Sequence, residues 1–183
     1  MDEKPNIQAL KRRAGHAVSS DKKLIRGIES TYRRNGAANL FAALEAATGK
    51  IHGKTAAPCQ KTKKGFIEFM DGLLMELPSA EEYHAILDNH SIHKRHDAWL
   101  EKHKNAFFHY TPTSASWMNM VEVWFGILAR KSLRGKSFSS TEELCMHIGK
   151  YIEAYNPTAK PFTWRKREVK GAQLSNKTDN FCN

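Results

Sequence analysis

The sequence predicts a single α/β domain, and three observations lead to that prediction. Short apolar runs typical of buried strands alternate with longer segments whose apolar residues recur at helical spacing. The length of 183 residues suits one domain. Hydrophobic residues make up 40% of the chain and charged residues 26%, which is typical of a folded globular protein. Because no apolar run approaches the roughly 18 residues that a membrane span needs, we expect no membrane partner.

The first half of the chain supplies a hairpin, a helix and a strand. Residues 37–54 contain two short apolar segments around Thr48-Gly49-Lys50, which predicts a hairpin, although the alanines of this region also suit a helix. Residues 62–77 carry apolar side chains at helical spacing, and Pro78 ends that helix. Residues 83–87 form a short apolar run between polar flanks, which indicates a buried strand.

The second half continues the alternation. The mostly charged residues 93–104 predict a surface helix, and residues 107–110 before Pro112 predict a strand. Apolar residues at helical spacing then predict a helix over 117–133. Residues 140–143 form a capping box for a last helix, which stops near Asn156-Pro157. Residues 171–183 lack periodicity and are expected to form a frayed tail.

The positive charge is concentrated in two segments. The net charge is +10, of which residues 11–34 contribute +6 and residues 160–170 contribute +4. Such concentration favours a polyanionic partner, although solvated loops on a basic protein would give the same pattern. The basic residues of the first segment are Lys11, Arg12, Arg13, Lys22, Lys23, Arg26, Arg33 and Arg34.

Cysteine and histidine usage argues against a zinc module. The chain has three cysteines, far apart, which excludes a disulfide scaffold and favours a reducing cytoplasm. His90, His93 and His96 recur every three residues, but no cysteine or acid accompanies them at ligand spacing.

Three acidic residues stand out by their context. Asp88 follows a predicted strand, Glu122 lies within an apolar helical segment, and Asp2 lies in Asp2-Glu3-Lys4-Pro5. Each acid alone is better explained as a cap or a surface charge. If they converge, their mutual repulsion calls for a hard divalent cation, and two such ions about 4 Å apart suit phosphodiester hydrolysis.

The acids and their neighbours together resemble the DDE transposases of bacterial insertion sequences, in the branch related to the mariner elements. Asp88 and Glu122 are 34 positions apart, as in that branch. The resemblance runs from Asp2 to about Trp164, and its specific blocks are Asp88-Asn89-x-x-x-His93 and Asn119-x-x-Glu122-x-Trp124.

The resemblance implies a ribonuclease-H-like fold, a mixed sheet flanked by helices, over residues 1–164, with residues 165–183 as a basic tail. It implies that Asp2, Asp88 and Glu122 are catalytic and bind two Mg²⁺ or Mn²⁺ ions. The implied activity is cleavage of double-stranded DNA at element ends, followed by joining of the 3′-hydroxyl to target DNA, with no small-molecule substrate. It also implies a homodimer on paired DNA ends and a location at the bacterial nucleoid.

Further basic residues are candidates for contacts with DNA phosphates, the alternative being a solvated face. Asn89, His90 and His93, beside the second acid, either orient Asp88, contact phosphate, or cap the helix that follows. The expected DNA-contacting residues are Arg12, Arg13, Lys22, Lys23, Arg33, Arg34, His93, Lys94, Arg130, Lys131, Arg165, Lys166 and Arg167.

The sequence departs from the family at its start, one residue before the first acid. The expected consequences are a first strand that is largely missing, an Asp2 at a frayed end beside the α-amino group, and impaired cleavage by this chain alone. Two hypotheses follow: a DDE transposase catalytic domain, or a catalytically inactive remnant that binds DNA non-specifically.

Overall fold

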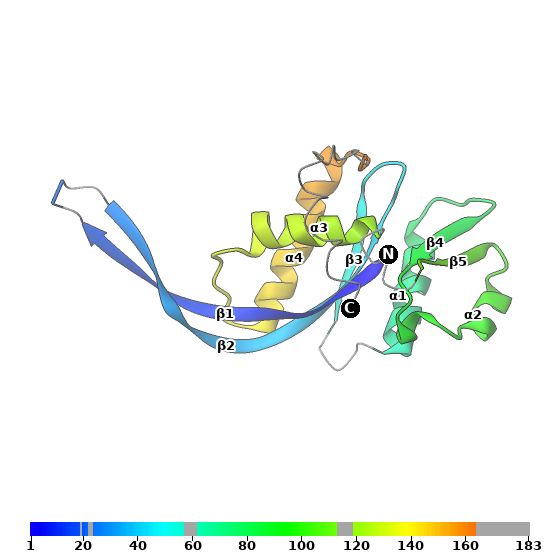
Figure 1. The fold of residues 1–183 in the computed structure, drawn as a ribbon, viewed down its shortest axis with the longest axis horizontal. Coiled ribbons are helices and arrows are strands. Elements are labelled where there is room, and N and C mark those ends of the chain that lie inside the picture. Colours follow the sequence, from blue (N-terminus) through cyan, green and yellow to red (C-terminus); the bar gives the residue numbers. More distant parts are fainter. Residues whose placement is uncertain (19, 22–23, 57–61, 113–118, 164–183) are drawn as a thin grey trace, which may run out of the picture.

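A mixed α/β fold is present in the computed structural model, which describes residues 1–18, 20–21, 24–56, 62–112 and 119–163. Side chains are not described for residues 13–19 and 22–30. A three-stranded antiparallel sheet has the order β1-β2-β3, and a two-stranded parallel sheet pairs β4 with β5. Helices lie around both sheets (Figure 1). The expected alternation of strands and helices is therefore confirmed in its coarse form.

A long hairpin dominates the N-terminal part. Strand β1 (Asp2–Val18) pairs antiparallel with β2 (Leu24–Leu44), and the outer part of the hairpin extends well away from the rest of the molecule (Figure 1). The register shifts between Lys4 and Ile7, between Gln8 and Leu10, and between Arg12 and Ala14. Six of the basic residues of the first segment thus lie on the two strands of this hairpin, which the sequence analysis did not predict: Lys11, Arg12, Arg13, Arg26, Arg33 and Arg34.

The expectation of a frayed Asp2 is wrong. Asp2 is the first residue of β1, pairs with Ala42, and is only 7% exposed. The strand continues C-terminal to this acid through a segment rich in charged residues, whose pattern does not predict a strand. The first strand is therefore not largely missing.

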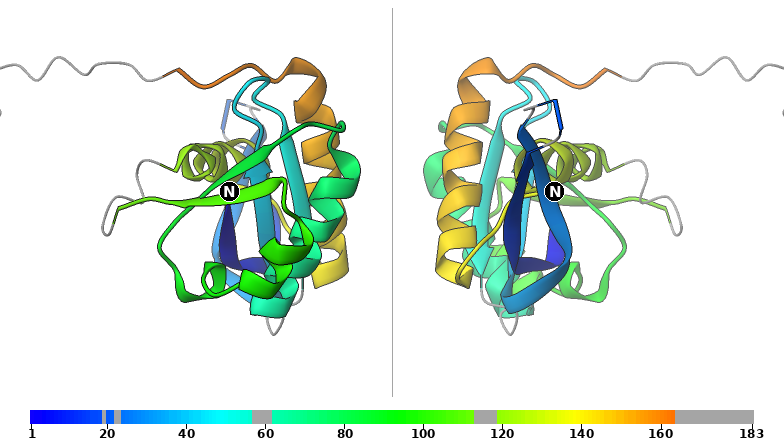
Figure 2. Two further views of the ribbon diagram at one scale, coloured as in Figure 1. Left: turned by 90° about the vertical axis from the view of Figure 1, so that its right-hand side faces the viewer. Right: turned by 90° about the vertical axis from the view of Figure 1, so that its left-hand side faces the viewer.

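Both faces of the three-stranded sheet are covered. Along β2, Leu40 and Ala42 face one core while Phe41 and Ala43 face another, as the alternation of side chains in a strand requires. The first core is closed by α3 (Met120–Leu128) and α4 (Thr141–Tyr155), and the second by α1 (Lys63–Glu76). Views along the hairpin show α4 alongside β3 (Ile51–Ala56) (Figure 2).

The predicted hairpin at residues 37–54 is confirmed. β2 and β3 pair antiparallel, and Gly49 adopts φ +78° in the turn, a backbone conformation that glycine accepts without steric cost. A Cβ at this position would lie 2.1 Å from the carbonyl oxygen of Lys160, so the close approach of that segment also requires glycine.

The two strands predicted at residues 83–87 and 107–110 are present as a parallel pair, but the first is buried on one face only, because His84 and Ile86 are exposed. They are β4 (Tyr83–Leu87) and β5 (Ala106–Tyr110). The connection between them contains the short helix η2 (Ser91–His93) and α2 (Asp97–Lys102). The predicted continuous helix over 93–104 is therefore wrong at its start, where His93 is fully buried in η2.

The C-terminal helices follow the prediction closely. The segment after α3 continues as one π-helical stretch, η4 (Ala129–Leu133), and residues 113–118 lie outside the described part of the chain. Ser140 caps α4 by accepting a hydrogen bond from the Glu143 backbone N–H at 3.2 Å, and a final turn, η5 (Asn156–Thr158), begins where the helix was expected to stop. Within the described residues, no helix combines the length and apolar character needed to cross a bilayer.

Candidate metal centre

The N-terminal end of β1 lies against the C-terminal end of β4. The Met1 amino nitrogen donates a hydrogen bond to the Ile86 carbonyl at 2.6 Å, so the start of β1 sits beside the strand that leads to Asp88. The first two acids of the candidate site are thus brought together by neighbouring strand ends.

Asp88 is held by the turn that follows β4. Its Oδ1 accepts a hydrogen bond from the His90 backbone N–H at 3.1 Å and lies 2.7 Å from Nδ1 of His93. A short acidic side chain that binds backbone two residues ahead is typical of turns. Both contacts engage Oδ1, and Oδ2 is the oxygen that they leave for a cation.

His93 bridges two acids in the interior. Its Nε2 lies 2.9 Å from Oε2 of Glu3, while its Nδ1 contacts Asp88. Burial lowers the pKa of His93, but the hydrogen bond with Glu3 and the charges of Glu3 and Asp88 outweigh this effect, so the pKa is raised. The ring also packs on Phe66, with centroids 4.9 Å apart. His93 therefore links Glu3 to Asp88 in the interior, and its raised pKa favours the protonated ring.

Glu122 lies in the first turn of α3, and the start of that helix is held beside Asp2. The residue before that helix, Asn119, is 3% exposed, and its Nδ2 donates to the Met1 carbonyl at 2.9 Å and to Oδ2 of Asp2 at 3.3 Å. These bonds fix the start of α3 against Asp2. Glu122 itself is exposed on the solvent side of the helix.

Burial and neighbouring negative charges both shift the pKa of the Asp2 carboxyl. Burial raises the pKa of its carboxyl from 3.8 to about 7; the Glu3 backbone N–H opposes the rise, and the charges of Asp88, Glu3 and Glu122 add to it. A buried carboxylate surrounded by like charges is unstable without a proton or a cation. The three acids singled out by the sequence therefore act on one another in the folded chain.

The donor atoms suit a hard cation. One ligand atom each of Asp2, Glu3 and His93 lies within 4.8 Å of the others. The two ring nitrogens of His93 already face Glu3 and Asp88, so the atoms left to coordinate are carboxylate oxygens. Oxygen donors are those that Mg²⁺ and Mn²⁺ prefer.

Comparison with known protein families agrees with this geometry. A family model described as DDE superfamily endonuclease matches residues 1–145. The chain belongs to the DDE superfamily of endonucleases. Membership implies a DNA substrate and divalent metal ions. Searches of curated proteins and of solved structures found no match.

The DDE domain places the expected DNA-contacting residues on several surfaces. His93 is fully buried between two acids, so the expectation that it contacts phosphate is wrong and its orienting role is supported instead. The exposed members are Arg33, Arg34, Lys94, Arg130 and Lys131, with Arg12 partly buried. The side chains of Arg13, Lys22 and Lys23, and all of residues 165–167, lie outside the described set.

Two residues of the DDE site were missed by the sequence reasoning. Glu3 was quoted only as part of a motif, yet its buried carboxylate binds His93. Asn119 was likewise quoted without a role. Their position in the sequence was the available signal: Glu3 is adjacent to Asp2, and Asn119 lies three residues before Glu122.

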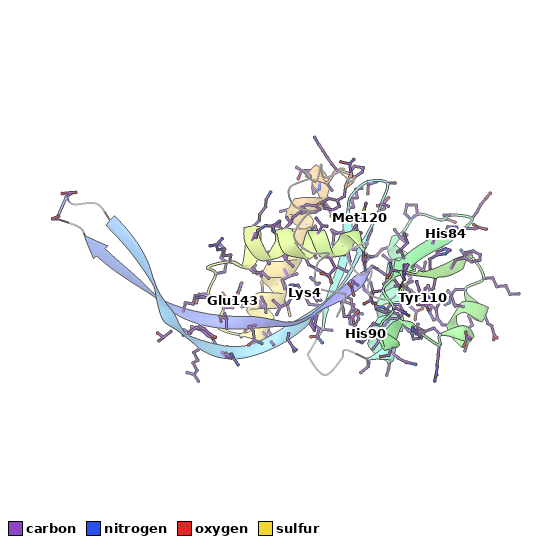
Figure 3. The ribbon with its side chains drawn as sticks, viewed as in Figure 1. Lys4, His84, His90, Tyr110, Met120 and Glu143 are labelled. Carbon is purple, nitrogen blue, oxygen red and sulfur yellow. The ribbon has the colours of Figure 1, made fainter. Side chains whose placement is uncertain are left out.

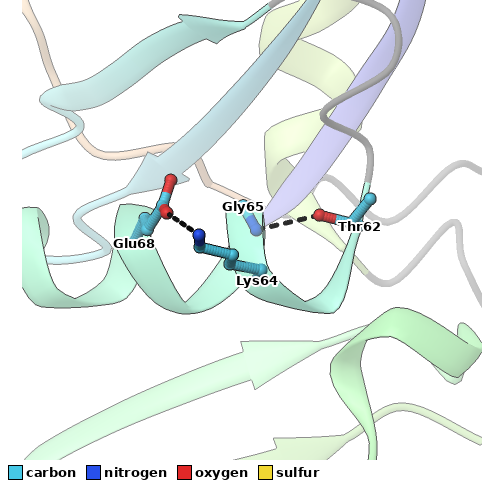
Figure 4. A pocket seen from close by; sticks show the side chains of 4 residues that line it. All are labelled: Thr62, Lys64, Gly65 and Glu68. Atoms are coloured by element: carbon cyan, nitrogen blue, oxygen red, sulfur yellow. Dashed lines mark hydrogen bonds and ion pairs between the residues drawn. The ribbon is translucent and has the colours of Figure 1, made fainter.

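A surface depression lies at the N-terminal end of α1. Thr62, Lys64, Gly65 and Glu68 line it (Figure 4). Thr62 Oγ1 accepts the Gly65 backbone N–H at 3.1 Å, and Lys64 pairs with Glu68 at 3.8 Å. These contacts are a helix cap and a surface ion pair, and they carry no chemistry for the DDE domain.

Proposed function

We propose that the chain is the catalytic domain of a DDE transposase of the Tc/mariner branch, with a ribonuclease-H-like arrangement of its sheets and helices. It would cut the DNA ends of an insertion sequence and join the resulting 3′-hydroxyl to target DNA. In this proposal Asp2, Asp88 and Glu122 hold two Mg²⁺ or Mn²⁺ ions.

One observation supports the proposal: the Asp2 carboxyl is buried at a strand end beside the strand that leads to Asp88, and burial, together with the charges of Asp88, Glu3 and Glu122, raises its pKa to about 7. A structural protein gains nothing from that repulsion, whereas a divalent ion removes it. When bound, two such ions would provide an activated water and stabilise the attacking and leaving oxygens of a phosphodiester.

The chain's own residues orient the proposed ligands. Asn119 fixes one oxygen of Asp2 and the start of the helix that carries Glu122. His93 fixes Oδ1 of Asp88, and Glu3 in turn fixes His93. Such supporting contacts are what keep metal ligands in a productive geometry.

The projecting hairpin is the proposed DNA contact. Tyr32 is 47% exposed, and the guanidinium carbons of Arg12 and Arg34 lie 5.6 and 5.9 Å from its ring centroid. The exposed Arg33 adds a third positive charge nearby. A ribbon that carries stacked arginines suits a phosphate backbone, and two domains acting on paired ends would each present one.

We propose that the domain extends beyond the matched residues 1–145, to about residue 164. Ile148 and Ile152 of α4 belong to the same core as Leu40. Asn156 then accepts a hydrogen bond from the Ile51 backbone N–H and donates to the Ile51 carbonyl, each at 2.9 Å, which ties the end of α4 to β3. Residues 165–183 would form the basic tail.

A nicking assay on supercoiled plasmid tests the catalytic assignment. We expect the chain to nick in Mg²⁺ or Mn²⁺, and we expect Asp88→Asn and Glu122→Gln to abolish nicking. Glu153→Gln, an exposed acid on α4, is the matched control and should nick normally. Nicking by either site variant would refute the metal-ligand assignment. No nicking by any protein would favour the inactive remnant.

Salt dependence tests the DNA contact. Each lost phosphate contact should reduce the slope of log affinity against log salt by about 0.9. We therefore expect a slope about 1.8 smaller for Arg33→Ala/Arg34→Ala than for the parent chain. An unchanged slope would remove the hairpin from the DNA interface.

A further inference from the structure

A pair of histidines lies on the outer face of the parallel sheet, apart from the acids. His84 on β4 is in register with Phe107, and His109 follows two residues later on β5, so both histidines project from the same face. Nδ1 of His84 lies 2.9 Å from Nε2 of His109. Figure 3 labels His84 on this sheet, well away from His90 near the acids.

The second nitrogen of His84 is already committed. Nε2 of His84 lies 3.0 Å from Oε2 of Glu82, so this nitrogen carries the proton and donates it to the carboxylate. The tautomer thus fixed leaves the Nδ1 lone pair to accept a hydrogen bond from Nε2–H of His109, so a metal ion binds both nitrogens once the proton of His109 has moved from Nε2 to its Nδ1. A carboxylate that binds the far nitrogen of an imidazole is the usual support of a metal-ligating histidine.

Packing also sets the orientation of the ring. The His84 ring stacks on Phe107, with centroids 5.2 Å apart and ring planes 21° from parallel. The side chain of His84 is nevertheless 52% exposed, so solvent reaches the pair. The two nitrogens are therefore prearranged and accessible.

The spacing fits one metal ion. Bonds of about 2.0–2.1 Å from a single ion to two nitrogens 2.9 Å apart enclose an angle of about 90°, and a few tenths of an ångström of opening gives a tetrahedral angle. The smaller angle suits Cu²⁺ or Ni²⁺, and the wider one suits Zn²⁺. Imidazole donors favour these ions over Mg²⁺, whereas the carboxylate donors of the acid cluster favour Mg²⁺.

We propose that His84 and His109, supported by Glu82, bind one transition-metal ion of the Zn²⁺, Ni²⁺ and Cu²⁺ class. The ion joins β4 to β5 and leaves its other coordination positions to water. Because β4 leads directly to Asp88, the bound ion also stabilises the strand that presents that acid.

Titration calorimetry with NiCl₂ on the untagged full-length chain tests the site. We expect saturable binding of one ion, its loss in His84→Ala and in His109→Ala, and about 10- to 100-fold weaker binding in Glu82→Gln. His52→Ala is the matched control, because His52 lies 3.3 Å from Glu76 and contacts no second imidazole among the described side chains. This variant should bind as the parent does. Millimolar Mg²⁺ should not compete.

Electron paramagnetic resonance with Cu²⁺ gives a second readout on the same proteins. The parent should show coupling to two imidazole nitrogens, and either single histidine variant to at most one. Ni²⁺ binding that persists in both single histidine variants, or no binding by the parent chain, would overturn the proposal. Because all three side chains are exposed, circular dichroism should show that the variants fold normally.

Discussion

Asp2→Asn should stabilise the metal-free protein. The Asp2 carboxyl has a pKa of about 7 when folded and 3.8 as its ordinary value, so the folded chain binds this proton more tightly than the unfolded chain does. Stability from this group is therefore fully present below pH 3.8 and is lost as the pH rises from there through 7. At pH 8 the shift of about 3 units corresponds to about 4 kcal/mol of destabilisation, whereas at pH 4 it is less than about 1 kcal/mol.

The asparagine removes the ionisation but weakens one contact. Asn119 Nδ2 donates to Oδ2 of Asp2, and loss of that hydrogen bond costs about 1 kcal/mol. The expected net gain is about 3 kcal/mol at pH 8, or about 6–12 °C in Tm for a chain of this size. At pH 4 the gain should vanish.

Urea unfolding in EDTA, followed by tryptophan fluorescence at pH 4 and pH 8, measures the effect. Asp21→Asn, on the exposed turn of the hairpin, is the control and should change stability by less than about 0.5 kcal/mol. Added Mg²⁺ should stabilise the parent chain and not Asp2→Asn. If Asp2→Asn gains nothing at pH 8, or gains equally at both pH values, the argument from burial and repulsion is wrong.

Two further changes probe the surroundings of the site. His93→Gln leaves Glu3 buried without its cation and should cost about 3–5 kcal/mol in urea unfolding. The loss should be larger at pH 6 than at pH 9, because the raised pKa of His93 stabilises the fold below its ordinary value of 6.5 and ceases to do so as the pH passes the folded value. The control is His96→Gln, which loses one hydrogen bond to the Ile92 carbonyl and should cost less stability. Equal losses in the two variants would contradict the bridging role of His93. Gly49→Ala should lower Tm and cost at least about 1 kcal/mol of stability, because of the positive φ at this position and the contact with Lys160. Gly72→Ala in α1, which has open space around it, should raise stability by about 0.5–1 kcal/mol. If Gly49→Ala leaves Tm unchanged, the turn relaxes to accept the side chain.

The sequence predicted those elements whose apolar residues follow a clear period. The helix at 62–77, the strands at 83–87 and 107–110, and the capped helix from Ser140 each bury one stripe of side chains, and that stripe is visible in the sequence. Gly49 likewise marked its turn.

The long hairpin was missed because its stability does not depend on a continuous apolar stripe. Beyond Leu10, the sequences of β1 and β2 show no regular alternation of apolar and polar residues, so no strand pattern is visible there. The three acids were predicted from motifs, whereas the His93 bridge was not decided by sequence. Two acids 85 residues apart bind opposite nitrogens of one ring, and only the fold brings them together.

The irregular register of the hairpin determines which insertions and deletions leave the geometry at Asp2 unchanged. In a strand, a slip of one residue turns every side chain to the opposite face, so a deletion within the regularly paired residues Asp2–Lys4 would turn the Asp2 carboxyl away from Asp88. At the irregularities farther out, opposite Gln8–Leu10 and Arg12–Ala14, β2 already holds extra residues. The outer hairpin can therefore change in length during evolution while the geometry at Asp2 stays constant.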